Sequence, residues 1–362
     1  MVAPLIFSGY NERAVLALCR FLDSLGRPFF LVAKSSIDSI LGSKYNAHVI
    51  YTRESIEINS DLIIRIGREV FSRGCTPALC PTSEFLNDFV LDNSESMKSD
   101  GWKWTFPPKE TYRAISEKGT SPYIFSQVEG VLKPTEQESG FWRAPCVLKP
   151  RVNISNGRVL YPILCKDSSE LNKSMGEIER TNWYCQEWIN GQSYYLLAYI
   201  DTAGNWSAAW QENLLQQPGG KSIVLARTCA NPGVPVKRIM AMLNDMAYRG
   251  PIMIEFLVTC DNRLYFIEAN PRFWGPLELV RLGCSSILHR YISDLDGLVC
   301  GESREENCGR IYYAWERGAR VGPLHRYPSA RQLSDRRLRQ LIAANDLYEG
   351  GSEQDTIGPI LS

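Results

Sequence analysis

Residues 251–272 have the sequence PIMIEFLVTCDNRLYFIEANPR, and this stretch decides how the rest of the chain is interpreted. Two apolar runs flank the polar turn at residues 260–263, a pattern that is typical of a β-hairpin. A four-residue loop would pair Thr259 with Leu264 and thereby set the register of both strands. The stretch therefore predicts a hairpin whose facing residues can be listed.

The predicted register places two acids, Glu255 and Glu268, directly opposite each other. Because side chains alternate along a strand, Asn270 shares the face of Glu268. Opposed like charges, about 5 Å apart at Cβ, destabilise a sheet. Either a cation lies between the carboxylates, or one carboxylate is protonated or solvated at an edge. Two carboxylates and an amide oxygen suit Mg²⁺, with phosphate oxygens completing its shell, so we predict a metal site.

Arg272 follows this set, one residue after Pro271. Proline cannot extend the ladder of hydrogen bonds, so we expect the chain to leave the sheet here. The guanidinium would then lie beside the metal and could hold a phosphoryl or carboxylate group. The alternative is an ordinary surface arginine.

The composition is that of an ordinary globular protein, with 44% hydrophobic and 22% charged residues in 362. That length predicts more than one packed subdomain. Lys+Arg and Asp+Glu both number 40, which disfavours a nucleic-acid partner. No apolar run is long enough to span a bilayer, and residues 1–8 lack the features of a signal peptide. We therefore expect a cytoplasmic protein without a membrane partner.

The eleven cysteines form no CxxC pair, so we expect reduced, mostly buried thiols. The three histidines have no nucleophile or metal-ligand partner in the sequence, and we expect structural roles for them.

The first hundred residues alternate short apolar runs with helical periodicity, which favours a parallel sheet covered on both faces. A helix over 15–25 is expected to stop at Gly26. No GxGxxG follows the first strand, so a dinucleotide site is not expected. This region either binds substrate at its strand ends or is purely structural. The expected strands are residues 4–8, 29–32, 48–51, 62–66 and 78–80.

A boundary is expected near residues 101–108, where tryptophans and a proline pair interrupt the pattern. The stretch 206–227 is polar, and its Pro218-Gly-Gly220 predicts a turn or mobile loop. The tail from residue 301 is polar. Helices are expected at 110–116, 121–128, 236–248 and 333–343, and strands at 146–149, 159–164, 183–188 and 194–200.

Four motifs occur in an order that resembles the ATP-grasp ligases, especially the carbamoyl-phosphate-synthetase-like, carboxylate–amine ligase branch. IEANPRFWG at 267–275 resembles the family's metal-binding motif. CVLKP at 146–150 and SEK at 116–118 resemble the segments that carry its two nucleotide-binding lysines. QEWING at 186–191 resembles its adenine-binding hinge strand. The resemblance covers residues 110–290.

The resemblance implies an α/β fold of the α+β ATP-grasp type. An N-terminal Rossmann-like parallel α/β domain would be followed by two α+β subdomains that sandwich ATP. The expected divisions are an N-terminal domain (1–105), a small subdomain forming the nucleotide lid (106–185), a large subdomain with the metal site (186–300) and a C-terminal polar extension packing on the core (301–362).

The resemblance also implies the chemistry: ATP and two Mg²⁺ ions, or Mn²⁺ in their place, would convert a carboxylate into an acyl phosphate. An amine would capture it, giving an amide, ADP and phosphate. The expected substrates are small carboxylates and amines such as amino acids. The implied nucleotide contacts are Lys118, Lys149, Gln186, Glu187, Trp188, Ile189 and Ser193. The implied metal ligands are Glu255, Glu268 and Asn270, and Arg272, Lys221 and Arg227 would steady the acyl phosphate.

Three positions depart from the family pattern. Ser193 occupies the place of an acid that holds the ribose in many relatives. The loop 151–158 has one glycine, Gly157, where relatives have several, so Arg151, Asn153 and Ser155 are candidate substitute donors. Met253 replaces a basic residue of some relatives, and Arg272 is a candidate for its task.

Other functions remain open at this point. An ATP-grasp enzyme could use another acceptor, through carboxyphosphate chemistry or ligation to a carrier protein. The chain could also be a non-catalytic nucleotide-binding module. A homodimer is expected by analogy, because dimers are common among the enzymes that the chain resembles.

Overall fold

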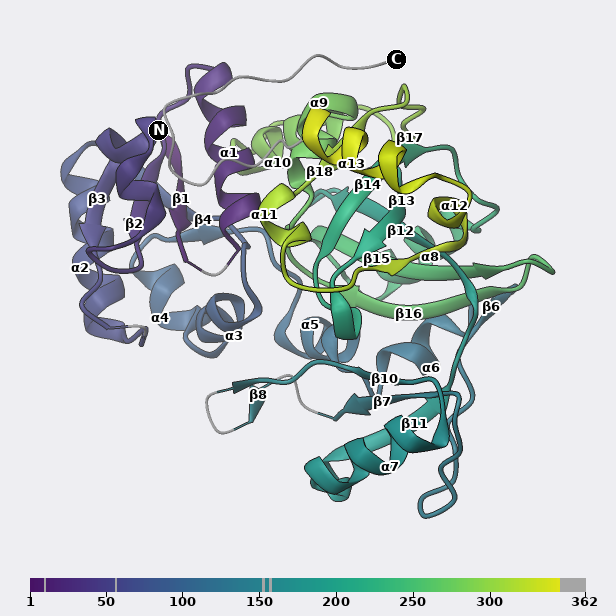
Figure 1. The fold of residues 1–362 in the computed structure, drawn as a ribbon. Helices are drawn as coiled ribbons and strands as arrows, with labels where there is room; N and C mark the ends of the chain where they lie inside the picture. The colour runs from purple at the N-terminus through teal and green to yellow at the C-terminus, as the bar shows by residue number, and fades with distance from the viewer. Residues whose placement is uncertain (10, 56, 152–153, 156–157, 346–362) are drawn as a thin grey trace.

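The computed structural model describes residues 1–345 except 10, 56, 152–153 and 156–157. Its N-terminal part is a five-stranded parallel sheet in the order β3-β2-β1-β4-β5, at the left of Figure 1. The predicted parallel α/β unit is thus confirmed. Its strands are β1 (Val2–Phe7), β2 (Phe30–Ala33), β3 (Val49–Thr52), β4 (Thr76–Leu79) and β5 (Lys103–Trp104). Its helices are α1 (Glu12–Ser24), α2 (Ser60–Ser72), α3 (Glu84–Asp92) and α4 (Ser94–Ser99).

Helix α1 ends as predicted, because Gly26 adopts a φ of +60° beyond its last turn. The prediction of a strand at 62–66 is wrong. Those residues lie in α2, which begins at a side-chain cap where Asn59 accepts a hydrogen bond from the Leu62 amide. The buried residues Ile63, Ile66 and Val70 recur at helical spacing, and the short apolar run concealed that longer period.

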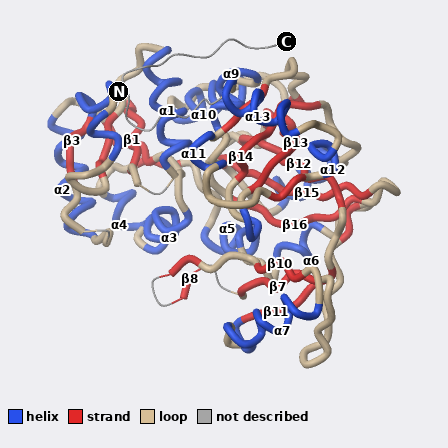
Figure 2. The backbone as a smooth tube through the Cα atoms, in the orientation of Figure 1, coloured by secondary structure: helices blue, strands red, loops and turns tan. Residues whose placement is uncertain are grey.

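A small antiparallel sheet lies below the central sheet in Figures 1 and 2, in the order β10-β7-β11. Its strands are β7 (Cys146–Pro150), β10 (Ile163–Cys165) and β11 (Trp183–Glu187), with α7 (Ser168–Glu177) packed against it. The expected strand at 159–164 is divided between β10 and β9 (Arg158–Val159), which pairs with β8 (Ile154–Ser155). Before this sheet come α5 (Lys109–Ser116), α6 (Ser121–Phe125) and β6 (Val131–Leu132).

The central sheet has nine strands in the order β18-β14-β13-β12-β15-β16-β6, with β17 and β19 both pairing with β13. Its long strands are β12 (Gly191–Ile200), β13 (Trp206–Gln216), β14 (Ile223–Cys229), β15 (Gly250–Thr259) and β16 (Leu264–Asn270). The short ones are β17 (Arg304–Glu305), β18 (Tyr312–Ala314) and β19 (His325–Arg326). A parallel sheet, two small antiparallel sheets and a mainly antiparallel central sheet make up this mixed fold, which agrees with the predicted class.

The polar stretch 206–227 is not a mobile loop, because most of it forms β13 and β14. Every residue of β13 is buried, and its polar side chains bond to one another and to side chains of the neighbouring strands, so composition concealed the strand. The predicted turn is correct: Pro218–Gly220 forms a short 3-10 helix between the two strands.

Helices cover both faces of the central sheet (Figure 1). On one face α9 (Leu277–Gly283) and α10 (Ser286–Leu295) share an apolar core with α1, which joins the N-terminal unit to the sheet. On the other face lie α6 and α8 (Val236–Asp245). The C-terminal segment adds α11 (Glu316–Ala319), α12 (Pro328–Arg331) and α13 (Asp335–Ala344).

The expectation that all cysteines are reduced is wrong for one pair. Cys284 and Cys308 form a disulfide, with their Cα atoms 5.9 Å apart. The two residues are 24 positions apart, and only the packing of the segment before β18 on the end of α9 brings them together. Within the described residues, no helix is long and apolar enough to cross a bilayer.

Candidate functional site

The hairpin β15–β16 places Glu255 opposite Glu268, as the sequence predicts. The predicted pairing of Thr259 with Leu264 is wrong, because Val258 is the partner of Leu264. A β-bulge at Ile267 then shifts the register by one residue. The turn is therefore one residue longer than expected, and the bulge restores the opposition of the two acids.

The bulge also connects the hairpin to the small sheet. The Lys149 ammonium, on β7, donates a hydrogen bond to the Ile267 carbonyl oxygen at 3.1 Å. Lys149 is only 5% exposed, although it carries a charged group. Two sheets thus meet at the carboxylates, and the lysine that the sequence assigned to phosphate lies at this junction.

Burial sets the electrostatics of the site. Burial and the neighbouring Glu268 charge raise the pKa of Glu255 to about 8, against the opposing effects of Ser193 and Lys149. Burial lowers the pKa of Lys149 to about 8, although Glu268 and Glu255 act in the opposite direction. Burial also lowers the pKa of Lys118, while Glu268 acts to raise it. Glu255 and the two lysines are thus desolvated together, an environment suited to a bound cation and a bound polyanion.

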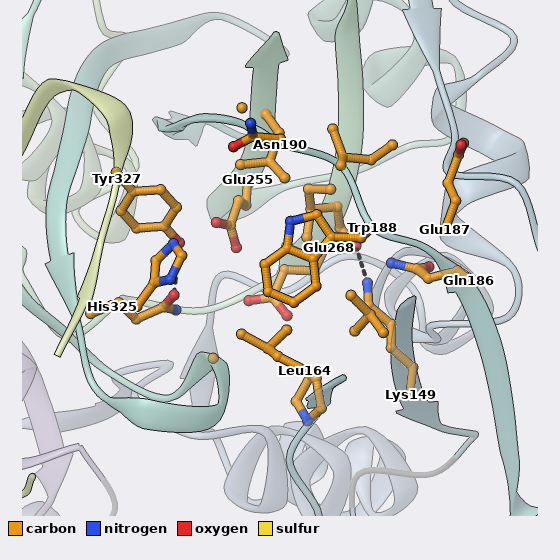
Figure 3. Close-up of a pocket in the computed structure, with 18 of the residues that line it drawn as sticks. Lys149, Leu164, Gln186, Glu187, Trp188, Asn190, Glu255, Glu268, His325 and Tyr327 are labelled. Atoms are coloured by element: carbon orange, nitrogen blue, oxygen red, sulfur yellow. Dashed lines mark hydrogen bonds between the residues drawn. The ribbon is translucent and has the colours of Figure 1, made fainter. Parts of the chain in front are cut away.

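A pocket of about 950 Å³, including its open mouth, lies between the small sheet and the central sheet. Figure 3 shows Glu255 and Glu268 near its centre, with Trp188 and Lys149 on one side and Tyr327 and His325 on the other. Of the predicted site residues, those that line it are Lys149, Gln186, Glu187, Trp188, Ile189, Lys221, Glu255 and Glu268. Lys118, Ser193, Asn270, Arg227 and Arg272 are not among its lining residues.

The hinge segment follows β11 and forms one wall of the pocket. The Glu187 carboxylate accepts a hydrogen bond from the Thr135 amide at 2.7 Å, which ties it away from the cavity. Trp188 is partly exposed and its indole projects into the space in Figure 3. This wall offers backbone groups and one aromatic face.

Ser193 does not lie where a ribose contact is expected. Its side chain is fully buried, and its hydroxyl donates to Glu255 Oε1 at 2.7 Å. Its distance along the sequence from the hinge suggested a ribose contact. The pleat of β12 instead directs this side chain towards Glu255, away from the cavity wall.

Asn270 and Arg272 lie next to the acids in a short chain of contacts. The Asn270 amide donates to Glu268 Oε1 at 2.9 Å, and its oxygen accepts from Arg272 at 3.1 Å. Arg272 also lies 3.9 Å from the Glu84 carboxylate, which comes from the start of α3. Asn270 is therefore beside the metal residues as predicted, but its oxygen faces the guanidinium and must turn to reach a metal.

The two remaining candidates for the acyl phosphate differ. Lys221 lines the pocket, and its ammonium lies 5.2 Å from the centroid of the Tyr161 ring. Arg227 instead bonds Glu212 at 2.7 Å and the Tyr312 hydroxyl at 3.4 Å. Because Arg227 lies on a strand and not on a mobile segment, its predicted approach to the substrate is not supported by its position.

Only part of the loop 151–158 lies within the described residues. Arg151 lies 3.7 Å from Glu136 and 5.5 Å from the centroid of the Tyr184 ring. Ser155 belongs to β8, whereas Asn153 and Gly157 lie outside the described residues. The proposed substitution of side-chain donors for glycines stays a prediction.

The C-terminal segment forms a third wall of the pocket, which no sequence motif predicts. His325, Tyr327 and Arg331 line the pocket, and the Tyr327 hydroxyl donates to Gln216 Oε1 at 2.7 Å. Burial, Arg331 and Lys166 lower the pKa of His325. No motif marks these residues, because only the pairing of β19 with β13 brings them to the site.

A metal ion fits this donor set only in part. No group of three or more His, Cys, Asp or Glu residues suited to a metal occurs among the described residues. Glu255 and Glu268 supply two carboxylates and Asn270 an amide, so the other ligands of a hard cation would be phosphate oxygens and water. The set thus suits a metal carried by a nucleotide better than a metal held by protein alone.

Among known proteins, similarity to this chain is found at the level of structure. No family model and no curated protein matches the sequence. Among solved structures, the biotin carboxylase domain of the Hydrogenobacter thermophilus 2-oxoglutarate carboxylase, a complex with MgADP, ADP and bicarbonate, is 16% identical with a TM-score of 0.63, covering 88% of this chain and 76% of that one.

Two further structures are similar. The Campylobacter jejuni biotin carboxylase, in complex with β-γ-ATP, is 16% identical with a TM-score of 0.63, covering 87% of this chain and 76% of that one. Rhizobium etli pyruvate carboxylase has the same identity and TM-score over 86% of this chain, but only 31% of its own length is covered. At this identity the likeness establishes the fold, and the expectation is confirmed: the chain has the ATP-grasp fold, as biotin carboxylase domains do.

Proposed function

We propose that this chain is an ATP-dependent ligase that phosphorylates a carboxylate and transfers the activated acyl group to an amine. The observation that carries the proposal is the opposition of Glu255 and Glu268 beside buried Lys149, within one pocket. Two facing carboxylates beside a buried lysine would hold a divalent cation and the phosphates of a nucleotide, and the cation would supply charge neutralisation there.

The nucleotide would lie between the two sheets. Its adenine would contact the backbone of the hinge at Gln186 and Ile189, with Trp188 and Tyr327 as neighbouring aromatic side chains. Lys149 and Lys118 would hold the phosphates, since both ammonium groups are close enough to sense the Glu268 charge. The bound complexes with MgADP and β-γ-ATP in similar structures support this placement by analogy.

Glu255 and Glu268, with Asn270 after rotation of its amide, would hold one or two Mg²⁺ ions, or Mn²⁺. The metal would neutralise charge on the phosphates during transfer. Burial and, after it, the Glu268 charge raise the pKa of Glu255. A bound cation would remove that conflict, which is why these residues fit the group.

The reaction balances without a protein nucleophile. A carboxylate oxygen of the substrate attacks the γ-phosphorus, and the bond between that phosphorus and the bridging oxygen breaks to release ADP. The amine nitrogen then attacks the acyl carbon, phosphate leaves with the bonding electron pair, and the amine loses a proton. Arg272, with Lys221 at the pocket edge, would bind the anionic acyl phosphate, so catalysis rests on positioning and electrostatics.

A second candidate shares the first step and differs in the acid. The Hydrogenobacter thermophilus domain is a complex with bicarbonate, which favours carboxyphosphate chemistry as the alternative. In that case bicarbonate would be phosphorylated, and an acceptor nitrogen would be carboxylated. Ligation to a carrier protein is a further version with a different acceptor.

The test is ADP release measured with MgATP in three sets of conditions: bicarbonate alone, single carboxylates, and carboxylate–amine pairs. We expect release that depends on a pair, with an amide product of matching mass. Release with bicarbonate alone would replace the proposal by carboxyphosphate chemistry. Nucleotide binding without ADP release in any condition would contradict it and indicate a non-catalytic module.

A further inference from the structure

Behind Glu255, three polar side chains form a continuous chain of hydrogen bonds inside the central sheet. Gln211 Nε2 donates to Asn213 Oδ1 at 2.6 Å, and Asn213 Nδ2 donates to the Ser193 hydroxyl at 2.7 Å. The Ser193 hydroxyl donates in turn to Glu255 Oε1 at 2.7 Å. We call Gln211, Asn213 and Ser193 the relay.

Every bond in the relay points towards the carboxylate. Gln211 and Asn213 each use an amide N–H group as donor, so the single proton of the Ser193 hydroxyl is directed at Glu255. With a cation bound beside it Glu255 would be ionised, and an ionised carboxylate only accepts hydrogen bonds, so it is the natural end of such a chain. Because Ser193 engages Oε1, the other oxygen of Glu255 is left for a ligand in the pocket, which Glu255 also lines.

The relay is built into three adjacent strands. Gln211 and Asn213 lie on β13, Ser193 on β12 and Glu255 on β15, so the backbone ladders fix their spacing. All three relay residues are 0% exposed. The side-chain amide oxygen of Gln211, Oε1, has no hydrogen-bond partner among the described residues. Its desolvation costs free energy, which an apolar residue at this position would avoid. Such a network in a sheet interior indicates a task other than packing.

We propose that Ser193, Asn213 and Gln211 are positioning residues that aim the Glu255 carboxylate at the divalent cation of the bound nucleotide. The inference rests on the proposed function, since it assumes that Glu255 is a metal ligand. It also gives Ser193 a role in place of the ribose contact that its position in the sequence suggested. Outer hydrogen-bond partners of metal ligands commonly change metal affinity about 10–100-fold when they are removed.

The decisive variant is Ser193→Ala, which removes the hydroxyl that donates to Glu255 Oε1, with little change in volume. Mn²⁺ binding to the protein–ADP complex is followed by the electron paramagnetic resonance signal of free Mn²⁺. We expect affinity for the metal to fall about 10–100-fold. ADP binding in EDTA, followed by tryptophan fluorescence, is expected to match that of the wild type, because the relay does not line the pocket.

Two matched variants separate positioning from packing. Ser193→Thr keeps the hydroxyl and is expected to retain most of the metal affinity. Ser207→Ala removes a buried hydroxyl on the neighbouring strand β13, one that accepts from Arg290 at 2.9 Å, and is expected to leave metal binding unchanged. If Ser193→Ala does not fold, Asn213→Asp serves instead, since it keeps the size and removes the donor to Ser193.

The outcomes are distinguishable. If the wild-type protein with ADP does not bind Mn²⁺, the proposed function itself is overturned. If the wild type binds Mn²⁺ and Ser193→Ala binds it equally tightly, the relay has no positioning role. Equal losses of metal binding and of ADP binding in EDTA would indicate a deformed pocket and would also overturn the inference.

Discussion

The hairpin β15–β16 and the hairpin β13–β14 belong to one sheet but use polar side chains in opposite ways. In the first, Glu255 and Glu268 interrupt apolar strands and face the pocket. In the second, Gln211, Glu212 and Asn213 are consecutive, buried and bonded to neighbouring side chains. An isolated acid on an apolar strand therefore marked the site, whereas a polar run concealed the strand that supports it.

The largest effect is expected at the first hairpin. Glu268→Ala should lower carboxylate-dependent ADP release at least about 100-fold, because a ligand of the nucleotide-bound metal is lost. Thermal unfolding should show a fold at least as stable as the wild type, since the variant removes an opposed like charge. Wild-type turnover in folded Glu268→Ala protein would contradict the assignment of Glu268 as a ligand of the nucleotide-bound metal.

Next in size is the link between the hairpin and the small sheet. Lys149→Met removes the contact with Ile267 and the charge facing the phosphates. A charge-assisted hydrogen bond contributes about 1.5–3 kcal/mol, so MgADP affinity should fall roughly 10–100-fold by titration calorimetry. Lys173→Met, an exposed lysine of α7, is the matched control. Equal affinities for the two variants would exclude Lys149 from the nucleotide site.

A smaller difference between the two hairpins is expected in how the free energy of unfolding depends on pH. The pKa of Glu255 is raised in the folded protein, from an ordinary 4.5 to about 8, so the folded state holds the extra proton between those values. The stabilisation is complete below pH 4.5 and is lost as pH rises towards 8, by at most about 1.4 kcal/mol per pH unit.

Chemical unfolding of the nucleotide-free protein at several pH values measures this slope. Glu255→Gln should flatten it, whereas Asn213→Leu in the second hairpin should keep it near that of the wild type, because Glu268 still faces Glu255. Above pH 8 the lowered pKa of Lys149 acts in the opposite direction, so the comparison is made below pH 8. His325, whose pKa is lowered, also titrates there, but it is common to the wild type and both variants, so the difference between their slopes reports on Glu255. An unchanged slope in Glu255→Gln would contradict the assignment.

The smallest effect on ligand binding is expected at Arg227. Its guanidinium bonds Glu212 and Tyr312, so Arg227→Ala should lower the free energy of unfolding by about 1–3 kcal/mol. MgADP affinity should stay within about twofold of the wild type, because a residue outside the pocket contributes no direct contact. A tenfold weaker affinity would contradict this and indicate that Arg227 contributes to nucleotide binding.

Local patterns predicted a large part of the fold. Periodicity and turn chemistry predicted helix α1, its end at Gly26 and the strands β7, β11 and β16. They also placed the two acids opposite each other, but from a turn register that is wrong, and the bulge restores the opposition. The failures are equally physical. A strand was wrongly predicted at residues 62–66, which lie in helix α2, because the apolar run was too short to distinguish a helical from a strand period. Strand β13 was not predicted because its burial depends on neighbours distant in sequence.

By itself, the amino-acid sequence determined the pair of acids, the buried lysine and their order along the chain, since these depend on residue type and short spacing. Only the tertiary structure decided the bulge that keeps Glu255 opposite Glu268, the turn of Ser193 beneath Glu255, the third wall at His325 and Tyr327, and the disulfide of Cys284 with Cys308. The reason is that each of these depends on contacts between segments far apart in the chain, which no local pattern encodes.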